Sequence, residues 1–371
     1  MRTIMSKKSF KLFDDMIKKS EEAIPYIQIL DEEGKLVNNG AKSSLTDEEL
    51  VDLMKTLVWG RTVNERLILA GKQGRIGNLP PSEGQEASQL ATLFAMKKTD
   101  FLIPSYRDVI PFVKHGLPMK NAVLWYQGHG SSNIFPEDVN GLPAQTIIGS
   151  QIVQAAGLGM AYKIDQKDQV VMTYIGDGGS SQGDFYEGIN FGGVFNSQMV
   201  VILQNNQYGI SVPRHKQSKA KTLAQKAAAA GIPGIQVDGM DPLAIYEATK
   251  MAREYTMAGN GPVVIETLTY RFGPHTLSDD PTRYRTQEEL DEWLAKDYLI
   301  RMNLYLSSKG LWNDEMEQEV VKATTEEVND ALNAAEAEPK QKVSTLLENV
   351  FEVPTPRIQK EIEMFKAKEE K

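Results

Sequence analysis

Short apolar runs alternate with helical segments through the middle of the chain, and this alternation limits the fold more than any other feature. Residues 169–175 (QVVMTYI) and 199–204 (MVVILQ) are rich in β-branched side chains and have the length of strands. Residues 184–195, between them, fit a helix. Because strands that are apolar along their whole length must be buried on both faces, the pattern predicts an α/β fold, with a mainly parallel sheet and helices on both of its faces.

The same alternation extends to both sides of this segment. We expect further strands at 235–237 and 263–270, and helices at 46–71, 83–94, 151–162 and 242–255. The first of these helices has the clearest start. Thr46 can cap its N-terminus, and three acidic residues follow in the first turn, where the helix dipole favours negative charge.

These elements divide the chain into three regions. Residues 1–45 are predicted to be an N-terminal arm, residues 46–310 an α/β domain, and residues 311–371 a helical C-terminal extension. The chain is charged and helical in character from residue 287 onward. Residues 273–286 (GPHTLSDDPTRYRT) form a polar, aperiodic loop, and loops of this length are often functional.

The composition excludes several classes of protein. The chain has 41 Lys and Arg against 50 Asp and Glu, a formal net charge of −9, which argues against a nucleic-acid-binding surface. It contains no cysteine, so disulfides, thiolate catalysis and zinc–thiolate sites are excluded. No apolar run reaches the roughly 20 residues of a membrane span, and the N-terminus lacks the apolar core of a signal peptide. We therefore expect a cytoplasmic enzyme.

Polar residues follow each of the two central strands. Gly176-Asp177-Gly178 comes directly after the first strand, and Asn205-Asn206 directly after the second. In a parallel sheet both motifs lie at the carboxyl edge, where open α/β sheets bind ligands. Glycines and a helix N-terminus suit a phosphate group, and carboxylate and amide oxygens suit Mg²⁺. Either motif alone is better explained by a tight turn, but their joint position favours a site for Mg²⁺ and phosphate.

The spacing of the two motifs resembles the thiamine-diphosphate-binding motif, in which about 26 residues separate Gly-Asp-Gly from Asn-Asn; here residues 179–204 separate them. More narrowly, residues 176–191 (GDGGSSQGDFYEGINF) and 204–211 (QNNQYGIS) are similar to alpha subunits of the decarboxylating component of the 2-oxo acid dehydrogenase family, pyruvate dehydrogenase in particular. The resemblance extends from about residue 46 to about residue 305. It implies the diphosphate-binding half of the thiamine-diphosphate-binding fold.

The resemblance implies a set of residues around the cofactor. The side chains of Asp177 and Asn206 and the backbone oxygen of Tyr208 would hold Mg²⁺. Gly178 and Gly179 would line the diphosphate.

Further segments match the same family. Tyr106-Arg107 corresponds to a pair that contacts the diphosphate, and Arg271 to an arginine that binds phosphate, a role that suits the guanidinium fork. Ile148 corresponds to an apolar residue that bends the cofactor from beneath, and His275 to a catalytic histidine on the active-site loop. By residue type alone, Ile148 could equally belong to the core, the arginines to surface ion pairs, and His275 to a solvated loop.

Three residues have weaker support. His129, in Gly128-His129-Gly130, is a second catalytic candidate or an ordinary loop histidine. Asp184 and Glu187 are three residues apart and so lie on one face of a helix. The resemblance implies that they form a proton relay in a polar tunnel between two active sites, but acids that are solvated or favoured by the helix dipole would look the same.

The resemblance also implies partners. Thiamine diphosphate acts as an electron sink in the decarboxylation of 2-oxo acids. In the family, the glutamate that activates it lies on a pyrimidine-binding domain, for which this chain has no room. We therefore expect a separate beta subunit, an α2β2 heterotetramer, and a lipoyl-bearing dihydrolipoyl acyltransferase that receives the acyl group.

The substrate is less well defined. Asn78-Leu79 stands near the substrate position of the family, where bacterial relatives usually carry an aromatic pair. Pyruvate is the first choice, with branched-chain 2-oxo acids and acetoin as alternatives. Two other classes remain: a nicotinamide-binding dehydrogenase, which Gly157-Leu158-Gly159 weakly suggests, and a non-catalytic cofactor-binding subunit.

Overall fold

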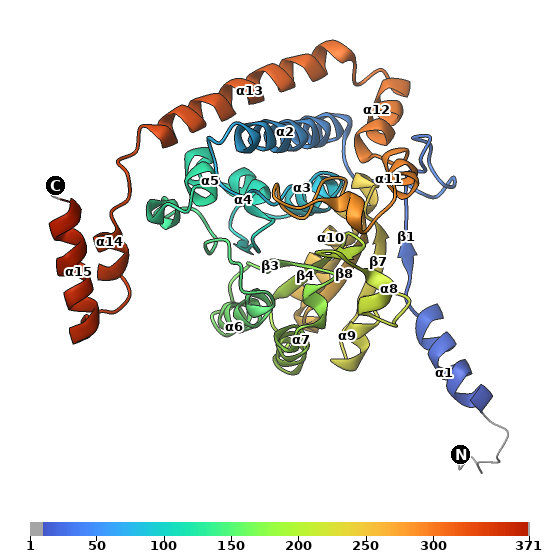
Figure 1. Ribbon diagram of the computed structural model, residues 1–371. Helices are drawn as coiled ribbons and strands as arrows, with labels where there is room; N and C mark the ends of the chain where they lie inside the picture. The colour runs from blue at the N-terminus through green and yellow to red at the C-terminus, as the bar shows by residue number, and fades with distance from the viewer. Residues whose placement is uncertain (1–9, 370–371) are drawn as a thin grey trace.

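A computed structural model describes residues 10–369 and shows a six-stranded parallel sheet with helices on both faces (Figure 1). The strands lie in the order β1-β7-β8-β4-β3-β2. Their bounds are β1 (Tyr26–Ile27), β2 (Phe101–Ile103), β3 (Val171–Gly176), β4 (Met199–Asn205), β7 (Gly234–Asp238) and β8 (Val263–Leu268). The predicted α/β fold with a parallel sheet is confirmed, and the four predicted strands are β3, β4, β7 and β8.

Side chains that alternate along the strands contribute to two separate hydrophobic cores. On β3, Met172 and Tyr174 belong to one core, whereas Val171 and Ile175 belong to the other. The first core includes α2 (Asp47–Lys72), α3 (Glu86–Phe94) and α10 (Pro242–Tyr255). The second includes α6 (Ser150–Ile164), α7 (Gly183–Phe195) and α9 (Lys226–Ala229). Because both faces of the sheet are covered, the central strands are apolar along their whole length.

Helix α2 begins as the sequence predicts. The Thr46 hydroxyl accepts a hydrogen bond from the Glu49 N–H (3.2 Å), and the Glu49 carboxylate accepts one from the Thr46 N–H (2.8 Å), which together form a capping box. Helix α13 (Asp314–Glu336) lies along the outer side of α2 and buries Val328 and Leu332 (Figure 1). Helices α14 (Val343–Glu348) and α15 (Pro356–Glu369) pair with each other to one side of the body.

The N-terminal arm adds a strand that the sequence did not predict. Helix α1 (Phe10–Glu22) leads to β1, which extends the sheet beside β7. The Asp241 carboxylate then accepts hydrogen bonds from the N–H groups of Ile29 (2.6 Å) and Leu30 (2.7 Å). A two-residue strand carries no periodic signal, which is why it was missed. Residues 1–9 and 370–371 lie outside the described residues, and the division into three regions stays a prediction.

Shorter elements complete the connections. They include α4 (Val109–His115), α5 (Met119–Tyr126), α8 (Arg214–Gln217), α11 (Gln287–Leu294), α12 (Tyr298–Ser308), β5 (Tyr208–Gly209) and β6 (Val212–Pro213). Helices α11 to α15 confirm the helical character predicted after residue 287. Over residues 10–369, no helix combines the length and apolar character needed to cross a membrane.

The weak signal for a dinucleotide-binding turn is wrong. Gly157 and Gly159 lie inside α6, and neither follows a strand. A glycine of the dinucleotide fingerprint must instead stand in the turn between a strand and the next helix. Gly159 serves helix packing, because a Cβ there would lie 2.3 Å from Ser197 Oγ.

Candidate functional site

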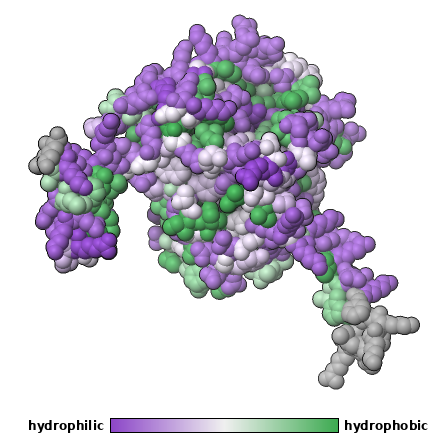
Figure 2. Space-filling view, in the orientation of Figure 1, coloured by the Kyte–Doolittle hydropathy of each residue, from purple (hydrophilic) through white to green (hydrophobic). Residues whose placement is uncertain are grey.

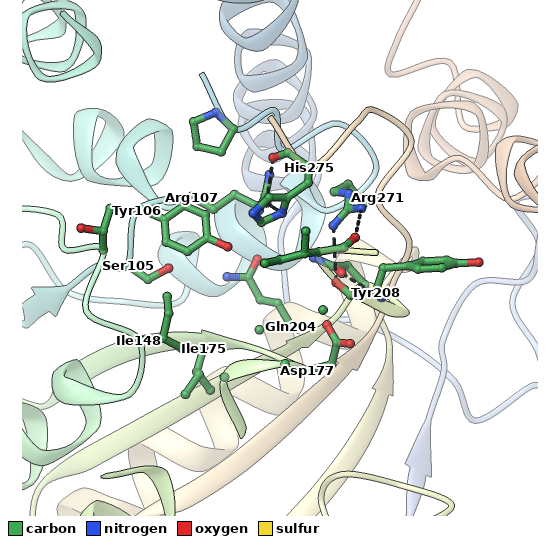
Figure 3. Close-up of a pocket in the computed structure, with 18 of the residues that line it drawn as sticks. Ser105, Tyr106, Arg107, Ile148, Ile175, Asp177, Gln204, Tyr208, Arg271 and His275 are labelled. Carbon is green, nitrogen blue, oxygen red and sulfur yellow. Dashed lines mark hydrogen bonds between the residues drawn. The ribbon is translucent and has the colours of Figure 1, made fainter. Parts of the chain in front are cut away.

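A cavity of about 570 Å³ opens at the carboxyl edge of the sheet, beyond the ends of β3 and β4 (Figure 3). The parallel register places Gly176 beside Gln204, so the residues that follow the two strands reach the same edge. Most of the residues predicted from the sequence to bind cofactor or metal, or to act in catalysis, line this cavity: Tyr106, Arg107, Ile148, Asp177, Gly178, Gly179, Asn206, Tyr208, Arg271 and His275. The fold therefore brings together segments that lie far apart in the sequence.

Two glycines allow close packing at the floor of the cavity. A Cβ at Gly179 would lie 2.6 Å from Ile175 Cγ1 and 2.9 Å from Ile148 Cγ2, and a Cβ at Gly178 would lie 3.1 Å from Gly209 Cα. A larger residue at either position would displace its neighbours. Ile148 is half-buried and lies next to Ile175 in Figure 3, so it is part of the cavity lining and not of the core.

Asp177 carries an unpaired buried carboxylate oxygen. Its exposed fraction is 2%, and its Oδ2 has no hydrogen-bond partner among residues 10–369. Burial raises the pKa of this carboxyl to about 6, and the positive charge of Arg271 acts in the opposite direction. A buried carboxylate is costly unless a cation neutralises it. The surroundings of Asp177 therefore fit a metal cation.

Two neutral oxygens lie near this carboxylate. Asn206 Nδ2 donates to Gln85 Oε1 (2.8 Å), which leaves its Oδ1 as the atom available to a cation. The backbone oxygen of Tyr208 also borders the cavity and accepts a long hydrogen bond from Arg271 Nη1 (3.4 Å). The described residues contain no cluster of three His, Cys, Asp or Glu side chains. A set of one carboxylate, one amide and one carbonyl suits Mg²⁺, which takes further ligands from phosphate and water.

Two guanidinium groups add positive charge to the cavity. Arg107 and Arg271 are buried, and in the described part of the chain their hydrogen bonds go to neutral acceptors. Arg271 Nη2, for example, donates to Ile210 O (2.8 Å) and Tyr284 Oη (3.0 Å). Burial, followed by the charge of Arg107, lowers the pKa of Arg271. Neither guanidinium has a salt-bridge partner among residues 10–369, and two such buried cations fit an anion with several oxygens, such as a diphosphate.

His275 is kept neutral by these arginines. Burial first, and then the charges of Arg107 and Arg271, lower the pKa of His275 to about 4. Its Nδ1 lies 3.0 Å from Arg107 Nη2, and its backbone N–H donates to Asp279 Oδ2 (2.8 Å). Because a guanidinium group can only donate, Nδ1 accepts and the ring proton resides on Nε2. At neutral pH the side chain is therefore a hydrogen-bond donor through Nε2.

Three predicted residues do not line this cavity. His129 accepts from the Ser131 N–H (3.3 Å), and its Nε2 lies 3.1 Å from Pro339 O, because the turn at Gly128 carries the chain toward the C-terminal segment. Asp184 and Glu187 lie in the first two turns of α7, and the side chain of Glu187 is exposed. Asp184 approaches Gly149, at the start of α6, without reaching the cavity lining.

Sequence reasoning missed several glutamine residues that line the cavity. Gln85 and Gln204 are buried there, and Gln151 and Gln217 border it as well. The position of Gln204, at the end of an apolar strand and directly before Asn205, is a signal that could have identified it. Gln85 has no such local signal.

Two comparisons relate the sequence to known proteins. Residues 54–344 match the dehydrogenase E1 component family. A protein of Staphylococcus aureus named pyruvate dehydrogenase E1 component subunit alpha is 51% identical over 346 residues, which are 93% of this chain and 94% of that protein. A protein of the same name from Staphylococcus epidermidis is 50% identical over 357 residues, which are 96% of each chain.

Proposed function

The chain belongs to the dehydrogenase E1 component family, and we propose that it is the alpha subunit of a pyruvate dehydrogenase, which decarboxylates the 2-oxo acid and transfers the acyl group to a lipoyl domain. Membership of this family implies dependence on thiamine diphosphate. The observation that carries the proposal is the buried Asp177 oxygen, which has no hydrogen-bond partner among residues 10–369 and shares one cavity with the buried guanidinium groups of Arg107 and Arg271.

The proposed Mg²⁺ site uses the strand ends. The side chains of Asp177 and Asn206 and the backbone oxygen of Tyr208 supply three ligands, and diphosphate oxygens supply others. Gly178 and Gly179 let the diphosphate approach the backbone, because a Cβ would clash at Gly179 and fit only tightly at Gly178. The buried Asp177 Oδ2, which has no hydrogen-bond partner among residues 10–369, supports this assignment, since a bound cation would favour the ionised form.

The proposed diphosphate and ring contacts lie around the metal site. Arg107 and Arg271 pair with diphosphate oxygens. Tyr106 contacts the cofactor beside Arg107, whose guanidinium lies over the Tyr106 ring at 5.3 Å. Ile148 supports the cofactor from the cavity floor.

His275 is the proposed catalytic side chain of this chain. Thiamine diphosphate, when bound, supplies the electron sink for decarboxylation. Because the pKa of His275 is lowered to about 4, the neutral ring can donate a hydrogen bond to the substrate or to the lipoyl group at pH 7. The catalytic role of His129 stays a prediction, to be tested by the activity of His129→Asn.

A beta subunit is the proposed partner, in an α2β2 heterotetramer that delivers the acyl group to a dihydrolipoyl acyltransferase. Large apolar side chains are exposed on α6 and α7, and Figure 2 shows apolar surface below the sheet. They are Val153, Tyr186, Phe191, Val194 and Phe195. A surface of this kind favours a protein partner. Asp184 and Glu187 lie on the same helix, where we propose that they relay protons between two active sites.

Pyruvate is the proposed substrate because both relatives, at 50–51% identity over more than nine tenths of the chain, are named for it. Asn78, Trp125 and Thr276 line the same cavity and are the side chains best placed to limit the size of the substrate. Comparison of kcat/KM for pyruvate, a branched-chain 2-oxo acid and acetoin tests this choice. The proposed location is the cytoplasm, which fractionation of cells would check.

Calorimetric titration with thiamine diphosphate and Mg²⁺ tests the proposed function, first with this chain alone and then with the chain co-expressed with a beta subunit. We expect Mg²⁺-dependent binding and pyruvate decarboxylation by the pair, and loss of both in Asp177→Ala. The matched control is Asp165→Ala, since the Asp165 side chain is 58% exposed on the surface. Absence of Mg²⁺-dependent binding by the assembled pair would contradict the cofactor assignment. Decarboxylation that survives in Asp177→Ala would contradict the assigned metal ligand.

A further inference from the structure

Four buried side chains form a continuous hydrogen-bonded chain that ends at Asn206. Gln204 Nε2 donates to Asp108 Oδ1 (2.7 Å), and Gln85 Nε2 donates to Gln204 Oε1 (3.0 Å). Asn206 Nδ2 then donates to Gln85 Oε1 (2.8 Å). The exposed fractions of the four residues lie between 0 and 5%, so water does not replace these partners. We call this set, Asp108, Gln204, Gln85 and Asn206, the amide chain.

Asp108 fixes the direction of the amide chain. It also accepts hydrogen bonds from the Ser105 N–H (3.1 Å), the Ser105 hydroxyl (2.8 Å) and Gln89 Nε2 (2.8 Å). Burial raises the pKa of Asp108, and the hydrogen bonds donated to it act against that rise. Because Asp108 Oδ1 already accepts from the Gln89 NH₂ group and Oδ2 from the Ser105 N–H, Oδ1 acts as an acceptor, and Gln204 must turn its NH₂ group toward Asp108 and its oxygen toward Gln85.

The same constraint passes along the amide chain to its end. Gln85 must give its NH₂ group to Gln204 and its oxygen to Asn206. Asn206 must therefore point its NH₂ group at Gln85, which leaves Oδ1 for the cavity. The Tyr208 N–H, 3.3 Å from Asn206 Oδ1, favours the same orientation. A reversed Asn206 amide would present N–H donors to a cation and repel it.

We propose that Asp108 is a positioning residue that determines, through Gln204 and Gln85, which atom of the Asn206 carboxamide faces the cation. This inference rests on the proposed Mg²⁺ site. Asp108 also adjoins Arg107, whose backbone oxygen accepts from Gln89 Nε2 (3.1 Å). One buried carboxylate thus orders both a ligand of the cation and the segment that carries a diphosphate-binding arginine.

Binding of Mn²⁺ in the presence of thiamine diphosphate tests the proposal on the assembled alpha–beta protein, with free Mn²⁺ measured by electron paramagnetic resonance. Gln85→Met and Gln204→Met interrupt the amide chain with side chains of similar length. We expect the Kd for Mn²⁺ to rise about 10–100-fold, the range for loss of outer partners of metal ligands. The control is Gln198→Met, which removes a buried glutamine just before β4, at the opposite end of that strand, and should leave the Kd unchanged.

A double-variant cycle separates amide orientation from a general disturbance of the cavity. Asn206→Asp replaces the carboxamide by two equivalent oxygens, so no orientation remains to be fixed. We expect Gln85→Met to weaken Mn²⁺ binding in the native background, and to leave it unchanged or tighter in the Asn206→Asp background. The same cycle is repeated with Gln204→Met, so that the result does not depend on a single variant that folds poorly. Circular dichroism with thermal melting checks the fold of each variant.

The outcomes are distinct. Equal losses of Mn²⁺ affinity in both backgrounds, or no loss in either, would overturn the role of Asp108 while the native protein still binds Mn²⁺ and the proposed function stands. If neither the native protein nor Gln198→Met binds Mn²⁺ with thiamine diphosphate, the proposed function fails and this inference fails with it.

Discussion

The cavity has two walls that are built differently. The first, which we call the strand-end wall, consists of Asp177, Asn206 and the buried side chains of the amide chain, and hydrogen bonds or close packing hold each group in place. The second, the loop wall, consists of residues 273–286, where Arg283 is exposed and Asp279 accepts hydrogen bonds from the His275 N–H and the Tyr284 hydroxyl. Backbone hydrogen bonds of a sheet stabilise the first wall, whereas turn hydrogen bonds and side-chain hydrogen bonds to neighbouring segments hold the second.

The difference separates two tasks. The strand-end wall holds an unpaired buried carboxylate and an oriented amide, both of which are energetically unfavourable without a ligand. These groups must therefore be held rigidly before a ligand binds. The loop wall carries His275, which in the proposed function meets a substrate that enters and leaves, and a segment outside the sheet can move for that purpose. We expect substitutions in the strand-end wall to change stability strongly, and substitutions in the loop wall to change local motion.

The largest expected effect is at Asp177 in the cofactor-free protein. Its pKa is raised from 3.8 to about 6, so its protonated form stabilises the fold below pH 3.8, and that contribution is lost as pH rises through 6. We expect Asp177→Asn to raise the free energy of unfolding at pH 7 by on the order of 1–3 kcal/mol, and by less at pH 4. Urea unfolding at both pH values measures this, with Asp165→Asn as control. Equal stability of native and Asp177→Asn protein at pH 7 would show that the wall carries no unpaired charge.

A matched pair of glycines compares the two walls directly. A Cβ at Gly179 would meet Ile175 at 2.6 Å, whereas a Cβ at Gly273 would meet the movable carboxylate of Glu83 at 3.0 Å. We expect Gly179→Ala to lower the free energy of unfolding by about 1–3 kcal/mol, as overpacking does. Gly273→Ala should change it by no more than about 1 kcal/mol. Urea unfolding measures the free energy of unfolding of both variants. Similar losses of this free energy in the two variants would show that the two walls do not differ in packing.

A smaller effect on stability is expected in the loop wall. Asp279→Ala removes the acceptor of the His275 N–H and of the Tyr284 hydroxyl. Because Asp279 is half-buried and its side chain accepts only these two hydrogen bonds from the described part of the chain, we expect about 1 kcal/mol of lost stability, together with faster tryptic cleavage after Arg283. The rate of cleavage is measured by mass spectrometry under native conditions. An unchanged rate would show that other contacts hold the loop.

The smallest effect concerns the charge of His275. Because burial lowers the pKa of His275 from 6.5 to about 4, the side chain contributes stability that is fully present above pH 6.5 and is lost as the pH falls through 4. The partial exposure of the ring reduces the size of this contribution. We therefore expect no titration of the His275 ring between pH 6 and 8 by nuclear magnetic resonance. Arg107→Met should raise the pKa of His275, because it removes one of the two positive charges that lower this pKa. A midpoint near 6.5 in the native protein would mean that the loop wall stands open to solvent.

Two residues of the strand-end wall, Asp177 and Asn206, could be predicted from the sequence. Residues 169–175 and 199–204 are apolar runs, each followed at once by polar residues, and a parallel register was enough to place Asp177 and Asn206 at one edge. Arg107, Arg271 and His275 were found only through resemblance to a family, since no local pattern shows that they share a cavity.

The two glutamines of the strand-end wall could not be predicted. Gln85 and Gln204 read as isolated polar positions, and they meet only because α3 packs across the sheet beside β4. Long-range contacts of this kind leave no periodic trace in a single sequence. The edge strand β2, three residues long, was missed for the same reason as β1. His129 lies outside the lining of the cavity, and its catalytic role stays a prediction.

The pair of buried guanidinium groups also bears on handling of the protein. If Arg107 and Arg271 bind diphosphate as proposed, inorganic phosphate or sulfate in a purification buffer carries the same oxygens that these side chains would recognise. Such anions would then compete with thiamine diphosphate, and the apparent dissociation constant would increase in proportion to phosphate concentration once the site is saturated with phosphate. Dialysis into an organic, uncharged or cationic buffer exposes the intrinsic affinity of the pocket.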